Sequence, residues 1–173
     1  FDEAVNVTWA KDHERAGVHV VYGVVGLKTH CKCVLVVRQE ESGLRRYVHV
    51  GTGNYNSKTA RTYEDIGLFT CNESIGDDVS HLFNSLTGFD RDHDYKRLIV
   101  APRYLRNKMI DLIKNEITFG SEGHMVIKIN GLADAEMIEL LYQASEAGVR
   151  IDLIVRGICC MRPSSDHEKN VRL

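Results

Sequence analysis

The 173-residue sequence has little of several features that mark special classes of protein. It contains only 2 prolines, which excludes a proline-rich linker and a collagen-like chain. It has no run of about 18 apolar residues, so we expect no segment that spans a membrane. Its 22 basic residues nearly balance its 24 acidic residues, whereas a nucleic-acid-binding domain is typically basic. We therefore expect no nucleic-acid partner.

The composition that is present, 43% hydrophobic and 27% charged, is typical of a globular domain. Five cysteines occur without a CxxC pair, which favours reduced thiols, a cytoplasmic location and no metal site. Cys31 and Cys33 are expected to be small buried side chains on one face of a strand. Phe1 is followed at once by a helical pattern and residues 170–173 carry no stop signal, so we expect a fragment of a longer protein.

Apolar spacing predicts an α/β fold in which helices and strands alternate. Residues 31–38 are nearly all apolar, as in a buried central strand, and are predicted to form a hairpin with residues 45–50. The expected helices are 2–15, 77–86, 104–118 and 133–147, the last two separated by a strand at 125–129. In the third of these helices we expect Leu105, Met109, Leu112 and Ile113 to face inward. The other expected strands are 18–22, 66–70, 98–101 and 149–155.

The polar stretch at residues 87–94 is the best candidate for a domain boundary. The motif Ala-Gly-Val joins a helix to a strand at residues 16–18 and again at residues 147–149. This repeat is compatible with two related domains, covering residues 1–94 and 95–173, of which the second is cut short.

The histidine and lysine that precede the first long apolar strand form the sharpest local motif. His30 and Lys32 are two residues apart, so in a strand both side chains leave on one face. A neutral imidazole is a competent nucleophile toward phosphorus, and an adjacent ammonium neutralises phosphoryl oxygens. This pair is a candidate for catalysis of phosphoryl transfer.

A glycine-rich loop, Gly51, Thr52, Gly53 and Asn54, directly follows the predicted strand 45–50. Glycines allow backbone N–H groups to approach an anion closely, and the side chains of Thr52 and Asn54 add donors. The alternative interpretation is a simple turn. Because the loop and the histidine–lysine motif follow and precede neighbouring strands, we expect them at one edge of one sheet.

Three further residues are weaker candidates. Arg156 ends an apolar strand, where ligands of α/β sheets tend to bind. Tyr63 is the aromatic residue that follows the glycine-rich loop and serves either to stack on a base or as core. His49 lies two residues before Gly51 and is interpreted as structural.

Two families share these motifs. An HxK motif followed by Gly-Thr-x-Asn resembles the phospholipase D superfamily, although Val37 stands where that superfamily has aspartate. The segments at residues 26–32 and 46–61, together with 1–3 and 155–157, are more closely similar to the ATP-dependent polyphosphate kinases of phospholipase-D-like fold. That resemblance implies a phospholipase-D-like catalytic domain followed by the first part of a similar second domain.

The resemblance also implies roles for individual residues. His30 matches the histidine that becomes phosphorylated, and Lys32 matches the lysine that contacts phosphoryl groups. Tyr63 and Arg156 match nucleotide-contacting positions. The family transfers the terminal phosphate of ATP reversibly to polyphosphate, uses Mg²⁺, and carries a second essential histidine that this chain lacks, so the fragment is expected to be inactive alone.

The resemblance leaves alternatives open. The implied partners are ATP or ADP and polyphosphate, with a homo-oligomer and a peripheral membrane association expected for the full-length enzyme. The alternatives are a phospholipase-D-like phosphodiesterase and a non-catalytic α/β module that binds anions.

Overall fold

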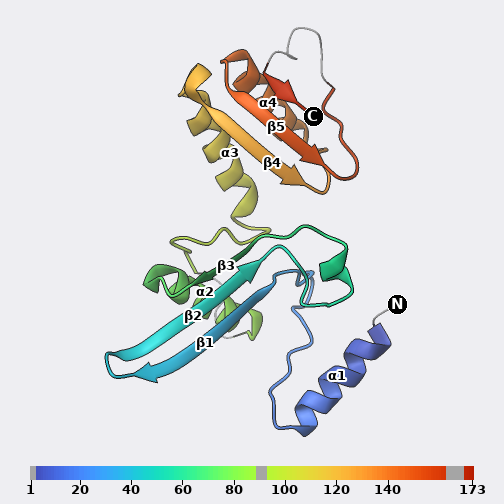
Figure 1. Cartoon of the computed structure of the whole chain (residues 1–173), viewed down its shortest axis with the longest axis vertical. Helices are drawn as coiled ribbons and strands as arrows, with labels where there is room; N and C mark the ends of the chain where they lie inside the picture. The colour runs from blue at the N-terminus through green and yellow to red at the C-terminus, as the bar shows by residue number, and fades with distance from the viewer. Residues whose placement is uncertain (1–2, 89–92, 163–169) are drawn as a thin grey trace. The chain divides into compact units, whose positions relative to one another are not determined.

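The computed structural model describes residues 3–88, 93–162 and 170–173 (Figure 1). The chain divides into two compact units, Phe1–Leu98 and Ile99–Leu173. Each unit contains one small sheet and its helices, which confirms the predicted α/β class. The expected boundary at residues 87–94 falls partly outside the described residues. No helix in the described ranges is long and apolar enough to cross a bilayer.

The first unit is built on a three-stranded antiparallel sheet with the order β1-β2-β3. Gly43 has φ +114°, a left-handed conformation that glycine adopts readily, and it closes the tight turn between β1 and β2. The register pairs His49 of β2 with Val34 of β1 and with Phe69 of β3. The elements are α1 (Glu3–Arg15), β1 (Cys33–Glu40), β2 (Gly43–Gly51), the 3₁₀ turn η1 (Thr59–Arg61), β3 (Gly67–Thr70) and α2 (Glu73–Leu86).

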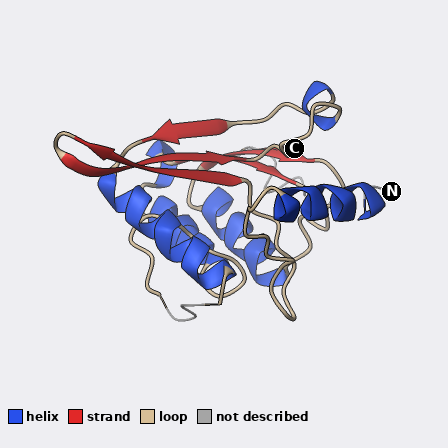
Figure 2. Cartoon of the chain, turned by 90° about the horizontal axis from the view of Figure 1, so that it is seen from below, coloured by secondary structure: helices blue, strands red, loops and turns tan. Residues whose placement is uncertain are grey.

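Helix α2 covers one face of this sheet. Gly76 of α2 lies so close to Arg46 that an added Cβ would be 3.0 Å from the arginine Cβ, and Val79 is fully buried. The opposite face is open and carries Val34, Val36 and Phe69, of which Phe69 is 82% exposed. Figure 2 shows the long hairpin nearly edge-on, so that its two faces can be told apart.

A buried carboxylate fastens the segment that leaves the first unit. Asp78 is fully buried in α2, and its side chain accepts hydrogen bonds from the backbone N–H groups of Lys96, Arg97 and Leu98 at 3.1, 2.6 and 2.9 Å. Burial opposes ionisation of Asp78, but these three donors and the nearby His93 outweigh it and hold the pKa below its usual value. The ionised carboxylate therefore stabilises the folded chain.

We expect Asp78→Asn to destabilise the chain by about 2–4 kcal/mol at neutral pH, because hydrogen bonds to a buried charge are lost and an amide N–H₂ faces three donors. Because folding lowers the Asp78 pKa, this difference is complete above the unfolded pKa of about 4 and disappears as pH falls through the folded value. Urea unfolding at pH 7 and at pH 3 measures both effects. The neighbouring Asp77→Asn, which removes partly exposed ion pairs, should cost under about 1 kcal/mol.

The second unit has a parallel sheet with the order β4-β5-β6. Helices α3 and α4 pack on one face of it around Ile113, Leu141 and Ile151. Asp134 caps α4 by accepting from the N–H of Met137 at 3.1 Å. The elements are α3 (Leu105–Ile117), η2 (Gly120–Glu122), β4 (His124–Ile129), α4 (Ala135–Glu146), β5 (Arg150–Val155) and β6 (Val171–Arg172).

Two predicted strands are wrong. Residues 18–22 are irregular and pair with no strand in the described chain; the nearby bridge between Val24 and Leu27 closes a local turn instead. Residues 98–101 are also irregular, because the N–H of Leu98 binds the Asp78 carboxylate and Pro102 follows directly. In both segments the apolar residues are present but the strand partner is not.

The predicted 31–38 strand exists but is neither central nor buried. β1 begins at Cys33 and lies at the edge of its sheet, and its side chains Val36 and Val37 are 46% and 52% exposed. In α3 the inward assignment is wrong for Leu105 and Leu112, which are exposed, while Ile110 and Ile113 are buried. A run of apolar residues predicts a strand or helix, but it does not show which faces the rest of the chain covers.

Candidate active site

The histidine–lysine motif lies in the irregular segment just before β1. His30 is exposed, and Lys32 is partly buried. The Lys32 ammonium lies 3.0 Å from both ring nitrogens of His30, and it donates to the His30 carbonyl at 3.2 Å. The two side chains are thus on the same side of the chain, although the segment is not a strand as predicted.

The glycine-rich loop lies beside this motif. The N–H of Gly51, the last residue of β2, donates to the carbonyl of Lys32 at 2.9 Å. This bond extends the β1–β2 pairing by one position past Cys33 and Val50. The structure therefore brings the two motifs to the same end of one hairpin, which confirms the placement that the sequence predicted.

Only part of the loop has N–H groups available for an anion. The Gly51 N–H is used by Lys32, and the Thr52 N–H donates to the carbonyl of Ile66 at 3.0 Å. The Thr52 hydroxyl is held as well, because it donates to Asp65 at 3.2 Å and accepts from the Ile66 N–H at 3.0 Å. In the described part of the chain, no hydrogen bond engages the N–H groups of Gly53 and Asn54. These two groups are the loop's candidate phosphate donors.

The loop glycines are required for space. A Cβ on Gly53 would lie 2.6 Å from the Cγ of Asp65, so any larger residue would displace that carboxylate. Gly51 and Gly67 are directly paired across β2 and β3, and the ring of His49 covers both. Asp65 was missed by sequence reasoning, since nothing in its local sequence reveals its contact with a loop 13 residues earlier.

His49 and Tyr55 connect the loop to the sheet. The Tyr55 hydroxyl and Nδ1 of His49 share a hydrogen bond of 2.6 Å, and the His49 ring packs on Phe69 with centroids 4.3 Å apart. The structural interpretation of His49 is consistent with these contacts. Tyr55 was not singled out from the sequence, although it immediately follows the Gly-Thr-Gly-Asn motif.

The other two predicted site residues lie in different units. Tyr63 follows η1 in the first unit and is 50% exposed. Arg156 is exposed and directly follows β5 in the second unit, where its N–H donates to the carbonyl of Ile129 at 3.0 Å. The position of Arg156 at the C-terminal end of a strand is as the sequence predicted, and its role with a nucleotide stays a prediction.

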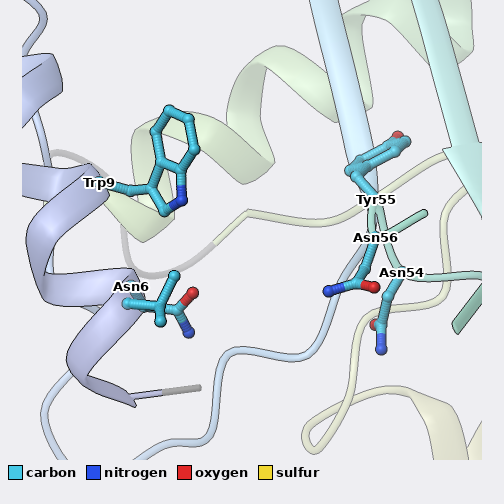
Figure 3. Close-up of a pocket in the computed structure, with 6 residues that line it drawn as sticks. Asn6, Trp9, Asn54, Tyr55 and Asn56 are labelled. Atoms are coloured by element: carbon cyan, nitrogen blue, oxygen red, sulfur yellow. The ribbon is translucent and has the colours of Figure 1, made fainter. Parts of the chain in front are cut away.

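A cavity of about 480 Å³ adjoins the loop within the first unit. Figure 3 shows Asn6 and Trp9 of α1 on one side and Asn54, Tyr55 and Asn56 on the other. The lining consists of amides, aromatic rings and one apolar side chain, without a charged group. The side chains of the cavity therefore supply no positive charge to a phosphate group.

Of the two cysteines beside His30, Cys33 is a poor competitor for its role. Cys31 is exposed, contrary to the expectation that it is buried, and Cys33 is partly buried. Burial, followed by the charge and hydrogen bond of Cys31, raises the pKa of the Cys33 thiol to about 11. Because only the thiolate is a strong nucleophile, Cys33 is unreactive at neutral pH.

The described fold and site define a mixed α/β protein in which a histidine–lysine pair adjoins a glycine-rich loop. The family described as polyphosphate kinase C-terminal domain 1 matches residues 1–92, and polyphosphate kinase C-terminal domain 2 matches residues 98–172. The chain belongs to the polyphosphate kinase family.

Individual relatives agree with this assignment. The chain is 54% identical to a polyphosphate kinase of Synechocystis sp. over 177 residues, covering 100% of this chain and 24% of the relative. It is 56% identical to one from Thermosynechococcus vestitus over 166 residues, covering 94% and 23%. The crystal structure of polyphosphate kinase from Porphyromonas gingivalis matches with a TM-score of 0.82 and 42% identity, over 99% of this chain and 29% of that chain. The chain thus spans about a quarter of the curated relatives' length.

Proposed function

We propose that the chain carries part of the active site of an enzyme that reversibly transfers the terminal phosphate of ATP to polyphosphate. The observation that carries this proposal is the contact of the Lys32 ammonium with the ring of His30, next to a loop with two unengaged N–H groups. Membership of the polyphosphate kinase family supports the choice of substrates.

In the proposed reaction a ring nitrogen of His30 uses its lone pair to form a bond to the γ-phosphorus of ATP. The bond from that phosphorus to the bridging oxygen breaks, and ADP leaves with the electron pair. The terminal oxygen of a polyphosphate chain then attacks the phosphohistidine and releases the imidazole. The Lys32 ammonium, which donates to the ring in the structure, would transfer its hydrogen bonds to the phosphoryl oxygens and so free the nucleophile.

The remaining predicted site residues complete the proposed substrate site. The N–H groups of Gly53 and Asn54 would donate to phosphoryl oxygens, with Gly51 and Thr52 holding the loop to the sheet. Tyr63 would stack on the base, and Arg156 would contact the nucleotide phosphates.

Magnesium is proposed as a companion of ATP. In the described ranges no group of three or more His, Cys, Asp or Glu side chains is arranged to hold a metal ion. The described residues therefore offer no cage of their own, and Mg²⁺ would arrive bound to the nucleotide phosphates, as is usual for this ion.

The context of the site is also a proposal. Residues 1–94 would form a phospholipase-D-like catalytic domain and residues 95–173 the first part of a second, similar domain. The second essential histidine would come from outside this chain, so we expect the chain alone to be inactive. The complete enzyme would be a cytoplasmic homo-oligomer with a peripheral membrane association.

The test is to replace the matching segment of the Synechocystis polyphosphate kinase with this chain, giving the exchange enzyme. We expect ATP labelled at the γ-phosphate to yield an acid-labile phosphohistidine that peptide mapping assigns to His30, and label that passes on to polyphosphate. Hydrolysis of a phosphodiester without a requirement for ATP would favour a phosphodiesterase instead. Absence of both reactions in a folded exchange enzyme would favour a non-catalytic module.

A further inference from the structure

Between Thr52 and Asn56, Tyr55 is the one residue whose side chain forms a hydrogen bond to the sheet in the described structure. The two ends of the loop are held separately, at Thr52 by Ile66 and at Asn56 by its side chain, which accepts from the N–H groups of Lys58 and Thr59. Between these ends, the Tyr55 hydroxyl is hydrogen-bonded to Nδ1 of His49 at 2.6 Å. The two candidate phosphate donors, Gly53 and Asn54, immediately precede Tyr55.

The His49 ring, which is the partner of Tyr55 in this hydrogen bond, is itself fixed by its neighbours. The His49 ring packs on Phe69 and lies over two paired glycines: a Cβ on Gly51 would be 3.1 Å from its Cε1, and a Cβ on Gly67 would be 2.7 Å from its Nε2. Because the pair lacks side chains, the imidazole can lie close to the backbone of β2 and β3. An imidazole held in this way is a rigid anchor for the loop.

The hydroxyl of Tyr55 keeps its proton at neutral pH, because burial and the neighbouring thiols of Cys33 and Cys31 raise the pKa of Tyr55. In the proposed arrangement this phenol donates, Nδ1 of His49 accepts, and the His49 ring proton is on Nε2. The same thiols belong to the segment that carries His30, so Tyr55 lies at the end of the hairpin where the candidate catalytic pair is found.

We propose that Tyr55 is a positioning residue that, through His49, holds the N–H groups of Gly53 and Asn54 in the geometry that receives the phosphate groups of the substrate. This inference rests on the proposed function for its substrate class. Its role is conformational, and Tyr55 takes no proton and forms no covalent bond.

The first test is Tyr55→Phe in the exchange enzyme. The variant loses the neutral hydrogen bond between residue 55 and His49, which contributes about 1 kcal/mol. If that free energy is lost from substrate binding, KM for ATP rises about three- to tenfold. We expect kcat to change less than twofold, because the loop binds phosphate groups before and during transfer alike. A purely structural loss of folded enzyme would lower kcat and leave KM unchanged. The matched control is Tyr22→Phe, which removes a hydroxyl that donates to Glu14 at 3.0 Å away from the loop, and its KM should not change.

A second measurement needs no catalysis. In the isolated chain, ¹⁵N spectra should show Nδ1 of His49 as the accepting nitrogen in the wild type and a changed Nδ1 signal in Tyr55→Phe. Titration with inorganic triphosphate should move the Gly53 and Asn54 amide signals, with a dissociation constant about three- to tenfold larger in the variant. Gly67→Ala, which would force the imidazole out of place, should reproduce the changes in the loop amides.

The outcomes separate this proposal from the proposed function. Unchanged triphosphate affinity and unchanged KM in Tyr55→Phe would overturn the positioning role even if His30 is phosphorylated. Weakened triphosphate binding in Tyr55→Phe, without any phosphotransfer in the wild-type exchange enzyme, would uphold the positioning role and contradict the proposed function. Triphosphate that leaves the Gly53 and Asn54 signals unmoved in the wild-type chain would also overturn the proposal.

Discussion

Replacing His30 with alanine in the exchange enzyme is expected to abolish both phosphohistidine formation and polyphosphate synthesis. The substitution removes the lone pair that would attack the γ-phosphorus, and the side chains beside it are poor substitutes. The Lys32 side chain is a donor in the structure, and the raised pKa of Cys33 keeps that thiol protonated. We expect a loss of at least about a thousandfold in kcat, in line with removal of nucleophiles from other covalent catalysts.

The matched control is His19→Ala, which removes another exposed histidine of the same unit. Incorporation of γ-labelled phosphate and polyphosphate synthesis are measured for both variants, with circular dichroism to show that each is folded. The His19 variant should keep wild-type activity. Labelled phosphohistidine that persists in the His30 variant would place the nucleophile elsewhere and remove the basis of the proposed function.

The juxtaposition of the two motifs could be predicted because hairpin geometry determines it. A strand that starts after Lys32 and an antiparallel strand that ends at Gly51 must have these two ends side by side, whatever the exact register. The bond between the Gly51 N–H and the Lys32 carbonyl is the observed result. The placement of the pair beside the loop was therefore accessible from two short sequence motifs.

The identity of the loop's available donors could not be predicted in the same way. Whether an N–H group is engaged depends on the return of the chain into β3, because Ile66, which directly precedes β3, supplies its carbonyl to Thr52 from 14 residues further along the chain. The contact between His49 and Tyr55 depends likewise on the absence of side chains at Gly51 and Gly67, which become neighbours only when β2 and β3 pair. Such information lies in tertiary contacts rather than in a local pattern.

The errors in the fold have a common physical origin. Val36 of β1 is apolar, as a buried strand requires, yet it lies on the face of the sheet that helix α2 does not cover in the described chain. At residues 98–101, the Asp78 carboxylate takes the N–H group of Leu98, which a strand would use for pairing. Local apolarity predicted which segments could form strands. Contacts with residues far along the chain determined which of these segments did so.

Replacing Lys32 with methionine is expected to lower the kcat of the exchange enzyme by about a hundred- to a thousandfold, with a smaller change in KM for ATP. Methionine keeps the length and apolar stem of the side chain but removes the ammonium that contacts both nitrogens of the His30 ring. The ammonium would act most strongly when charge spreads over the phosphoryl oxygens during transfer, and removal of one such donor in other enzymes costs this much.

Two further variants show whether charge near His30 is sufficient or whether its position matters. Lys28→Met removes an exposed positive charge four residues before Lys32 in the same segment. We expect kcat to stay within about twofold of the wild-type value, as for a solvated surface charge. Lys32→Arg keeps the charge but replaces a compact ammonium with a planar group, so we expect only partial recovery of kcat. Single-turnover phosphorylation of His30 by γ-labelled ATP measures the three variants. Equal losses in Lys28→Met and Lys32→Met would indicate a general electrostatic effect and contradict a role for Lys32 at the reacting phosphoryl group.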